Sequence, residues 1–249
     1  MERYNNIIEF DEISSTNDYA MDLVRREQVP EFTVIRTDFQ TKGRGQIGNC
    51  WVSNRGENLL FSVILHPSHI PANNQFILSQ CVSMAVRDTI ACFCDNVTVK
   101  WPNDVYVGER KIAGILIENL LISKMIETSV VGIGLNVNQT SFVGAPNPTS
   151  LKLEIGRECD CKAVLELFLT KFKECYEAIS ENEDAIRTAY KQHLYLLNTV
   201  SLFKDKNGVF KGAISDVGED GKLLIIDENG AHRQYYFKEV EYLHHHFDR

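Results

Sequence analysis

The 249-residue sequence has no long hydrophobic run and no excess of basic residues. No apolar stretch approaches the ~18 residues that a membrane-spanning helix needs, and the N-terminus lacks the basic start and apolar core of a secretory signal. The formal charge of −8 is opposite to the charge of a typical nucleic-acid-binding surface. We therefore expect a cytoplasmic protein with neither a membrane nor a nucleic acid as its partner.

The seven cysteines follow neither a zinc-binding pattern nor a Cys-x-x-Cys redox motif. A single residue separates Cys92 from Cys94 and Cys159 from Cys161. We interpret the cysteines as free thiols in a reducing compartment. The terminal run 244–246 consists of three histidines that could chelate a metal, but a solvated chain end is the simpler interpretation.

The order of the sequence patterns favours an α+β fold. A hydrophobic content of 44% is enough for a buried core, and the length fits one large domain or a main domain with a small appendage. Apolar helical stripes alternate with strand-like runs, and short turns join many of the strands, which favours a mixed sheet with flanking helices. We expect strands at 7–13, 33–36, 58–65, 97–100, 112–118 and 129–136, and helices at 75–94, 162–180 and 183–195, with another helix directly after Ser15.

The pattern changes at Thr199. Short strands at 200–203, 209–217, 223–226 and 234–237 are separated by turns of the Asn-Gly or Asp-Gly type. This rhythm predicts a small C-terminal β-barrel. We expect a catalytic or binding domain at 1–197 and a second domain at 198–249.

The segment 40–51 combines three glycines with Lys42, Arg44 and Trp51 between two predicted strands. Glycines allow the backbone to present successive N–H groups to an oxygen-rich ligand, and the two cations add positive charge. A solvated turn is the alternative. Because apolar anchors come only at Ile47 and Trp51, we expect this glycine loop to become ordered over a bound ligand.

Four motifs in this order resemble those of the biotin protein ligases, which activate biotin with ATP and attach it to a lysine of a carrier protein. The motifs are Ser14-Ser15-Thr16-Asn17, the glycine loop, Lys100-Trp101-Pro102-Asn103-Asp104 with the following Lys111 to Glu118, and Gly132-Ile133-Gly134-Leu135-Asn136. The resemblance covers most of residues 10–140. The C-terminal strand pattern is similar to the SH3-like domain of the same family.

The resemblance implies that Lys111, Arg44 and Asp104 are the catalytic residues. Lys111 would contact the carboxylate and the α-phosphate in both half-reactions, and its alternative is a surface lysine in a turn. Asp104 would hold Mg²⁺ or accept the proton of the attacking lysine, and the sequence does not separate these roles. The turn chemistry of Pro-Asn-Asp is the structural alternative for Asp104 and Asn103.

The resemblance also implies two groups of binding residues. Biotin carries a polar ureido head on an apolar body, which suits a few hydroxyl and amide partners in an apolar slot. The residues implied for biotin are Ser15, Thr16, Asn17, Gln40, Arg44, Gly45, Gln46, Lys111, Gly114 and Ile115. The residues implied for ATP or the adenylate are Gly43, Arg44, Trp51, Asn103, Lys111 and Asn136. A helix cap is the alternative for Ser15, and a close backbone approach is the alternative for the glycines before Asn136.

Two features depart from the pattern of other family members. Many members have a second arginine where this sequence has Gln46, and that arginine is linked in the family to tight retention of the adenylate. Glutamine brings no charge, so phosphate contact is expected to fall on Arg44, Lys42 and Lys111. Some members carry a helix-turn-helix domain before the catalytic core, whereas here the first motif begins at Ser14, so we expect a ligase without repressor activity.

The expected partner is the biotin carrier domain of a biotin-dependent carboxylase, with biotin and ATP as substrates and Mg²⁺ as cofactor. Both a monomer and a homodimer are compatible with the resemblance. A lipoate or octanoate ligase is the nearest alternative, because it shares the adenylate chemistry. A non-catalytic sensor of biotin or nucleotide is an alternative from another class, although it would not need both Lys111 and Asp104.

Overall fold

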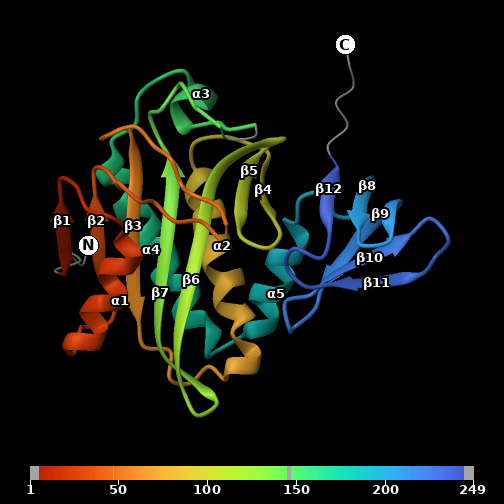
Figure 1. Ribbon diagram of the computed structural model, residues 1–249, viewed down its shortest axis with the longest axis horizontal. Helices are drawn as coiled ribbons and strands as arrows, with labels where there is room; N and C mark the ends of the chain where they lie inside the picture. Colours follow the sequence, from red (N-terminus) through yellow and green to blue (C-terminus); the bar gives the residue numbers. More distant parts are fainter. Residues whose placement is uncertain (1–5, 47, 145–146, 244–249) are drawn as a thin grey trace.

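A seven-stranded mixed sheet forms the centre of the N-terminal part of the molecule (Figure 1). The computed structural model describes residues 6–46, 48–144 and 147–243, so the predicted anchor Ile47 and the histidine run 244–246 lie outside the described residues. The strand order is β1-β2-β3-β7-β6-β5-β4, and β1 pairs with β2 in parallel while the other neighbours are antiparallel. The strands are β1 (Ile7–Phe10), β2 (Thr33–Thr37), β3 (Asn58–Leu65), β4 (Val97–Lys100), β5 (Asp104–Val107), β6 (Arg110–Ile122) and β7 (Met125–Asn136).

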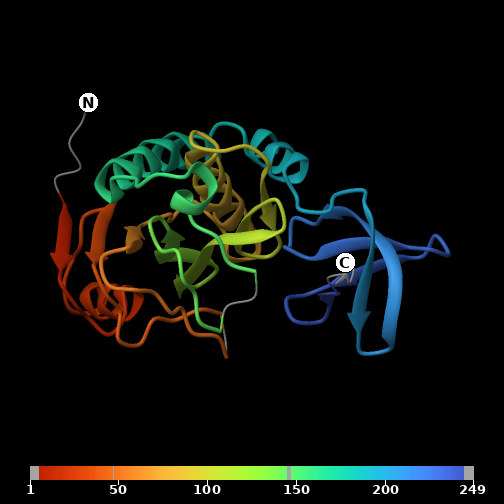
Figure 2. The same ribbon diagram turned by 90° about the horizontal axis from the view of Figure 1, so that it is seen from above.

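Helices cover both faces of this sheet (Figure 2). The helices α2 (Phe76–Ile90), α4 (Cys161–Ile179) and α5 (Glu183–Gln192) lie together on one face, while α1 (Thr16–Arg26) contacts β3 and β7 from the other. As predicted, Ser15 caps α1, because its hydroxyl oxygen accepts a hydrogen bond from the Asp18 N–H at 3.3 Å. Among the described helices, none is both long and apolar enough to cross a membrane.

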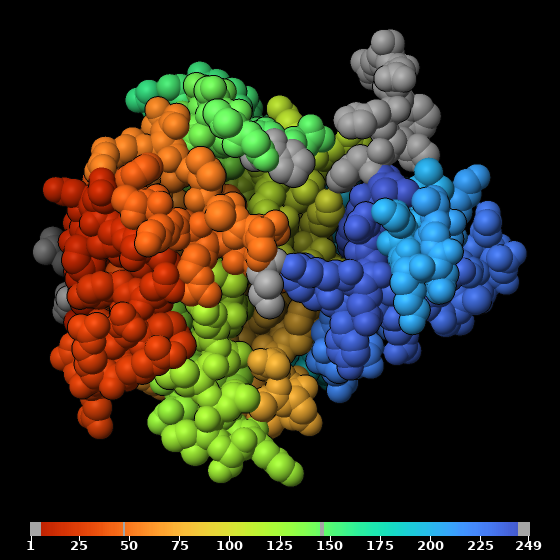
Figure 3. All heavy atoms as spheres, in the orientation of Figure 1, coloured from red at the N-terminus to blue at the C-terminus, as the bar shows by residue number. Residues whose placement is uncertain are grey.

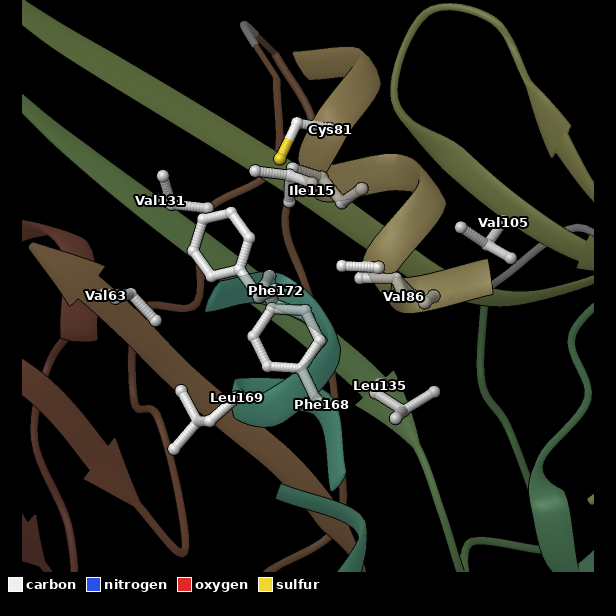
Figure 4. Packing of buried hydrophobic residues seen from close by; sticks show 14 of the residues in the cluster. Val63, Cys81, Val86, Val105, Ile115, Val131, Leu135, Phe168, Leu169 and Phe172 are labelled. Atoms are coloured by element: carbon white, nitrogen blue, oxygen red, sulfur yellow. The ribbon is translucent and has the colours of Figure 1, made fainter. Parts of the chain in front are cut away.

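The main hydrophobic core fills the space between the sheet and the layer of α2 and α4. Phe168 and Phe172 of α4 stack with ring centroids 5.4 Å apart, and Phe168 also meets Phe61 of β3 edge-on at 5.2 Å. Figure 4 shows these rings among aliphatic side chains such as Val131 and Leu135 of β7. Every residue of β3 is buried, as its continuous apolar pattern predicted for a central strand.

A second, antiparallel sheet follows in the C-terminal part, in the order β11-β10-β9-β8-β12. Its strands are β8 (Val200–Asp205), β9 (Gly208–Val217), β10 (Leu223–Asp227), β11 (His232–Tyr235) and β12 (Glu241–Leu243). Among the described residues the pairing is an open series, and closure into an SH3-like barrel stays a prediction. The fold is therefore α+β with a separate C-terminal sheet, and the domain boundary at residue 197 stays a prediction.

The two sheets share one hydrophobic cluster. Val99 of β4 and Trp101 pack in the same cluster as Phe203, Ile214 and Leu223 of the C-terminal strands. The indole N–H of Trp101 also donates a hydrogen bond to the Gly221 carbonyl at 2.9 Å. The segment that leads from β4 to Asp104 is thus held between the two sheets.

The sequence did not predict four short elements. These are the 3₁₀ turn η1 (Ala72–Asn74), the helix α3 (Leu151–Ile155) and the strands β5 and β12. Elements of three to five residues show too few repeats for a periodicity to be recognised. The predicted helix at 75–94 also ends earlier, at Ile90, before a turn in which Asn96 takes a φ of 57°.

Candidate active site

A cavity of about 190 Å³ lies where the start of α1, the glycine loop and strands β6 and β7 meet. In the space-filling view, the orange segment around residue 50 and the blue C-terminal part lie close together on the same face of the molecule (Figure 3). The C-terminal part contributes Phe237 to the cavity lining. The predicted residues in the lining are Ser15, Thr16, Asn17, Gln40, Arg44, Gly45, Gln46, Trp51, Asn103, Asp104, Lys111, Gly114 and Ile115.

The glycine loop folds as a small hairpin over this cavity. The Trp51 N–H donates to the Gly43 carbonyl at 3.0 Å, and the Gly45 N–H donates to the Asn49 carbonyl at 3.0 Å. The base of the loop is attached to the segment before α1, because the Lys42 N–H donates to the Ser14 carbonyl at 2.9 Å. Backbone hydrogen bonds therefore hold Arg44 and Trp51 on opposite arms of one hairpin.

Two glycines on neighbouring strands form a floor beneath Trp51. Gly114 of β6 pairs directly with Gly134 of β7. A Cβ atom at Gly134 would lie 2.7 Å from Trp51 Cδ2, and one at Gly114 would lie 3.0 Å from Trp51 Cζ3. Because carbon atoms in ordinary contact are 3.5–4.0 Å apart, only glycine lets the indole lie this close to the sheet.

A buried cluster of hydroxyl and amide groups occupies the end of the cavity at α1. Gln40 Oε1 accepts hydrogen bonds from the Thr16 N–H at 2.8 Å and the Thr16 hydroxyl at 3.1 Å. Ser62 Oγ lies 2.6 Å from Asn17 Oδ1 and 2.8 Å from Thr16 Oγ1. The close approach of Asn17 requires Gly132, where a Cβ atom would lie 2.8 Å from Asn17 Cγ. The cluster offers donors and acceptors to a small polar head group.

Arg44 is held by two carboxylates. Its guanidinium donates to Glu118 Oε1 at 2.8 Å and to Glu118 Oε2 at 3.1 Å, and it also pairs with Asp18. The hydrogen bond to Glu118 is the largest cause that raises the pKa of Arg44 above its usual value. Arg44 is therefore a fixed cation at the mouth of the cavity.

Lys111 and Asp104 form an ion pair inside the cavity. Lys111 Nζ lies 2.7 Å from Asp104 Oδ1, and it lies 5.8 Å from the centre of a Trp51 ring. About a quarter of each charged side chain is exposed, 28% for Lys111 and 22% for Asp104. The pair thus places a cation and a carboxylate beside the glycine floor, where a substrate would have access to both.

A third charged group lies next to this pair but outside the cavity lining. Lys100 Nζ lies 4.8 Å from the ring centroids of Tyr106 and Tyr242 and 5.7 Å from that of Tyr195. Burial lowers the pKa of Lys100 to about 8, and the nearby Asp104 partly opposes that shift. Tyr242 belongs to β12, so this tyrosine cage links the C-terminal sheet to the residues before Asp104.

Three predicted residues do not line the cavity, and one of them is Lys42, which is exposed. Gly43 lies at the base of the hairpin, and Asn136 is 5% exposed, with its amide donating to the Thr149 carbonyl at 2.9 Å. Asn103 lines the cavity and also has a structural task, because its amide donates to the Ile115 carbonyl at 2.8 Å. Both its turn interpretation and its ligand interpretation are compatible with this geometry.

The sequence did not identify three residues as part of the site, namely Ser62, Glu118 and Phe237. Glu118 follows Gly114 by two strand repeats, so alternation along β6 would have placed both on one face. Ser62 is a polar residue within β3, where every other residue after Asn58 is apolar, which was also a usable signal. Phe237 lines the cavity only because the C-terminal sheet packs against Trp101, and no local pattern carries that information.

The described residues contain no group of three or more His, Cys, Asp or Glu that could hold a metal ion on its own. Asp104 is the carboxylate closest to Lys111 in the cavity. A magnesium ion is commonly held by one or two carboxylates together with substrate phosphates. The cavity therefore fits a metal that arrives with a nucleotide better than a resident metal.

Comparison with known sequences gives a consistent family assignment. The profile of the biotin/lipoate A/B protein ligase family matches residues 9–136. The bifunctional ligase/repressor BirA of Bacillus spizizenii is 30% identical over 237 residues, covering 92% of this chain and 72% of that protein. The biotin–[acetyl-CoA-carboxylase] ligase of Paracoccus denitrificans is 26% identical over 220 residues, covering 85% of this chain and 90% of that protein.

The solved structures agree with the sequence comparisons. The biotin protein ligase from Aquifex aeolicus in complex with biotin and ATP superimposes with a TM-score of 0.79 at 27% identity. The match covers 96% of this chain and 98% of the Aquifex chain, so it includes the C-terminal sheet as well as the mixed sheet.

Proposed function

Since this chain belongs to the biotin/lipoate A/B protein ligase family, we propose that it is an ATP-dependent biotin–protein ligase. It activates biotin to biotinyl-5′-AMP and then transfers the biotinyl group to a lysine of a carrier protein. The observation that carries this proposal is the cavity itself. A buried hydroxyl and amide cluster lies at one end, and the Lys111–Asp104 pair lies near the glycine floor at the other.

The first half-reaction joins the biotin carboxylate to the α-phosphorus of ATP, and pyrophosphate leaves. Negative charge accumulates on the phosphate oxygens, and a fixed cation lowers the energy of that transition state. Lys111 supplies this cation, because its ammonium already lies in the cavity and needs only to exchange Asp104 for a phosphate oxygen. Gly45 and Gln46 of the glycine loop line the same cavity.

The second half-reaction transfers the biotinyl group. The neutral ε-amine of a carrier lysine attacks the carbonyl carbon of the mixed anhydride, the carbon–oxygen bond to the phosphate breaks, and AMP leaves. The attacking amine must lose a proton, and Asp104 is the nearest carboxylate to receive it. The Trp51 indole lies against the glycine floor, where it would shield from water an anhydride bound beside it.

Magnesium is the proposed cofactor. When bound to the ATP phosphates, it would neutralise part of their charge. Asp104 is the residue that would contact it, and the single carboxylate is consistent with a metal held mainly by the nucleotide.

The proposed partner is the biotin carrier domain of a biotin-dependent carboxylase. The name of the Paracoccus relative, a biotin–[acetyl-CoA-carboxylase] ligase, supports this choice. The cytoplasm is the proposed compartment. All seven cysteines lack a disulfide, which suits a reducing environment.

The test is an adenylation assay with the purified protein, Mg²⁺ and α-labelled ATP. We expect labelled adenylate and pyrophosphate with biotin, and no adenylate with lipoate or octanoate at the same concentration. Adenylate formed only with lipoate or octanoate would assign the chain to the lipoate branch of the family. The absence of adenylate with every acid would favour a non-catalytic sensor.

A further inference from the structure

Glu118 joins the two halves of the cavity that the proposed function uses separately. Its Oε2 accepts a hydrogen bond from Asn17 Nδ2 at 2.9 Å, and its two oxygens accept from Arg44 at 2.8 and 3.1 Å. One carboxylate on β6 therefore contacts α1 on one side and the glycine loop on the other. The Glu118 side chain is 27% exposed, so it is largely covered by these partners.

The contacts of Asn17 fix which way its amide faces. Its nitrogen donates to Glu118 and to the Leu116 carbonyl at 3.2 Å, so both N–H groups are used. Its oxygen faces Ser62 Oγ at 2.6 Å and keeps one lone pair. A carboxylate has no hydrogen to give, so the amide nitrogen must face Glu118. Because both N–H groups of this amide are used, Asn17 can only accept a further hydrogen bond, from an N–H or O–H of the ligand.

Glu118 also anchors the glycine loop. The loop contains Gly43, Gly45 and Gly48, and a chain rich in glycine loses more conformational entropy when it becomes ordered. The two-pronged ion pair with Arg44 is the strongest polar geometry available to a guanidinium and a carboxylate. The position of the loop over the cavity therefore depends on the same side chain that orients Asn17.

We propose that Glu118 is a positioning and specificity-determining residue that sets the Asn17 amide to accept a ureido N–H and anchors Arg44 of the glycine loop. This inference rests on the proposed function, because the ureido group is the head of biotin. Glu118 is not among the residues that line the cavity, so it would act through Asn17 and Arg44. Its carboxylate orients Asn17, the residue that would bind the ureido head, and holds the glycine loop through Arg44.

The first test compares Glu118→Gln with the wild type in steady-state adenylation. A glutamine amide can turn either its oxygen or its nitrogen to Asn17, so only the Leu116 carbonyl is left to orient the Asn17 amide. We expect the KM for biotin to rise tenfold or more, with kcat at saturating biotin within about threefold of the wild-type value. Glu127→Gln is the matched control, since Glu127 is an exposed glutamate on the neighbouring strand β7, and its KM should not change.

The second test uses biotin methylated separately at each ureido nitrogen. The wild type should discriminate against at least one methylated form by tenfold or more in KM, because the methyl group removes an N–H that Asn17 accepts. Glu118→Gln should reduce this discrimination to less than threefold. Trypsin cleavage after Lys42 and Arg44 should also be several-fold faster in Glu118→Gln, because the loop has lost its anchor.

The outcomes separate this inference from the proposed function. A wild type that forms no biotin adenylate would refute the proposed function. An active wild type whose discrimination against the methylated forms persists in Glu118→Gln would overturn the inference alone, and so would a fall in kcat with unchanged KM. If Glu118→Gln does not fold, Glu118→Asp withdraws the carboxylate by one methylene and is measured in the same assays, with the same expected loss of discrimination.

Discussion

The contribution of Lys100 to the stability of this protein should increase as the pH rises above 8. Burial among three tyrosines lowers the pKa of Lys100 from 10.5 to about 8 in the folded state. An unfolded chain keeps the lysine proton up to the ordinary pKa. Between these two pH values Lys100 binds more protons in the unfolded state than in the folded state, so its contribution to the free energy of unfolding rises with pH.

The expected size follows from the pKa difference. A lowering of about 2.5 units corresponds to about 3 kcal/mol, of which about 2 kcal/mol should be recovered between about pH 7 and pH 9.5. This is an upper bound, because the faces of the tyrosine rings attract the ammonium and oppose the loss of its proton.

The assay is urea unfolding of the wild type and Lys100→Met at several pH values across this range. Taking the difference between the two proteins cancels the titration of groups that both contain. The difference should shift in favour of the wild type by up to about 2 kcal/mol at the alkaline end. Lys124→Met, at an exposed lysine, should give a difference that does not change with pH. A flat difference for Lys100→Met as well would mean that the lysine stays charged inside its cage, and the reasoning would be refuted.

Three further predictions concern the cavity. Lys111→Ala should lower the adenylation rate at least a hundredfold, on the order of 3 kcal/mol of transition-state stabilisation, and a single-turnover rate close to the wild-type rate would exclude this role. Gly134→Ala should push Trp51 off the glycine floor and raise the KM for ATP. The free energy of unfolding should change by less than about 1 kcal/mol, because the glycine loop can move away from the added methyl group. An unchanged KM would show that the glycine floor does not position the indole. Gln46→Arg should retain biotinyl-5′-AMP longer during gel filtration, and an unaltered release rate would argue against a role of Gln46 in retention.

The mixed sheet and most of its helices could be predicted from the sequence because local patterns determine them. The apolar run of β3 and the Ser15 cap before α1 are read within a few residues, and both lie where they were expected. The predicted C-terminal strands also agree with β8 to β11, since Gly-containing turns mark their ends.

The arrangement of the site was only partly predictable, because it depends on contacts between distant segments. Asn136 lies on a motif strand, yet the loop at Thr149 takes up its amide and buries it. Glu118 lies within a recognised motif, but the sequence assigned no role to it, because its partners Asn17 and Arg44 come from other elements. The sequence indicated which side chains are polar, and only the fold shows which of them face one another.

The hydrophobic cluster shared by the two sheets determines how damage to the C-terminal sheet will be observed. Phe203, Ile214 and Leu223 pack against Val99 and Trp101, which directly precede the Asn103–Asp104 turn. A destabilising substitution in these strands would therefore loosen the segment that carries Asp104 while leaving every cavity residue chemically intact. In a genetic screen such a variant would be scored as catalytically defective, although the altered residue lies outside the cavity. The C-terminal sheet thus forms part of the catalytic scaffold, and an assay of isolated residues 1–197 would underestimate the chemistry that the cavity can perform.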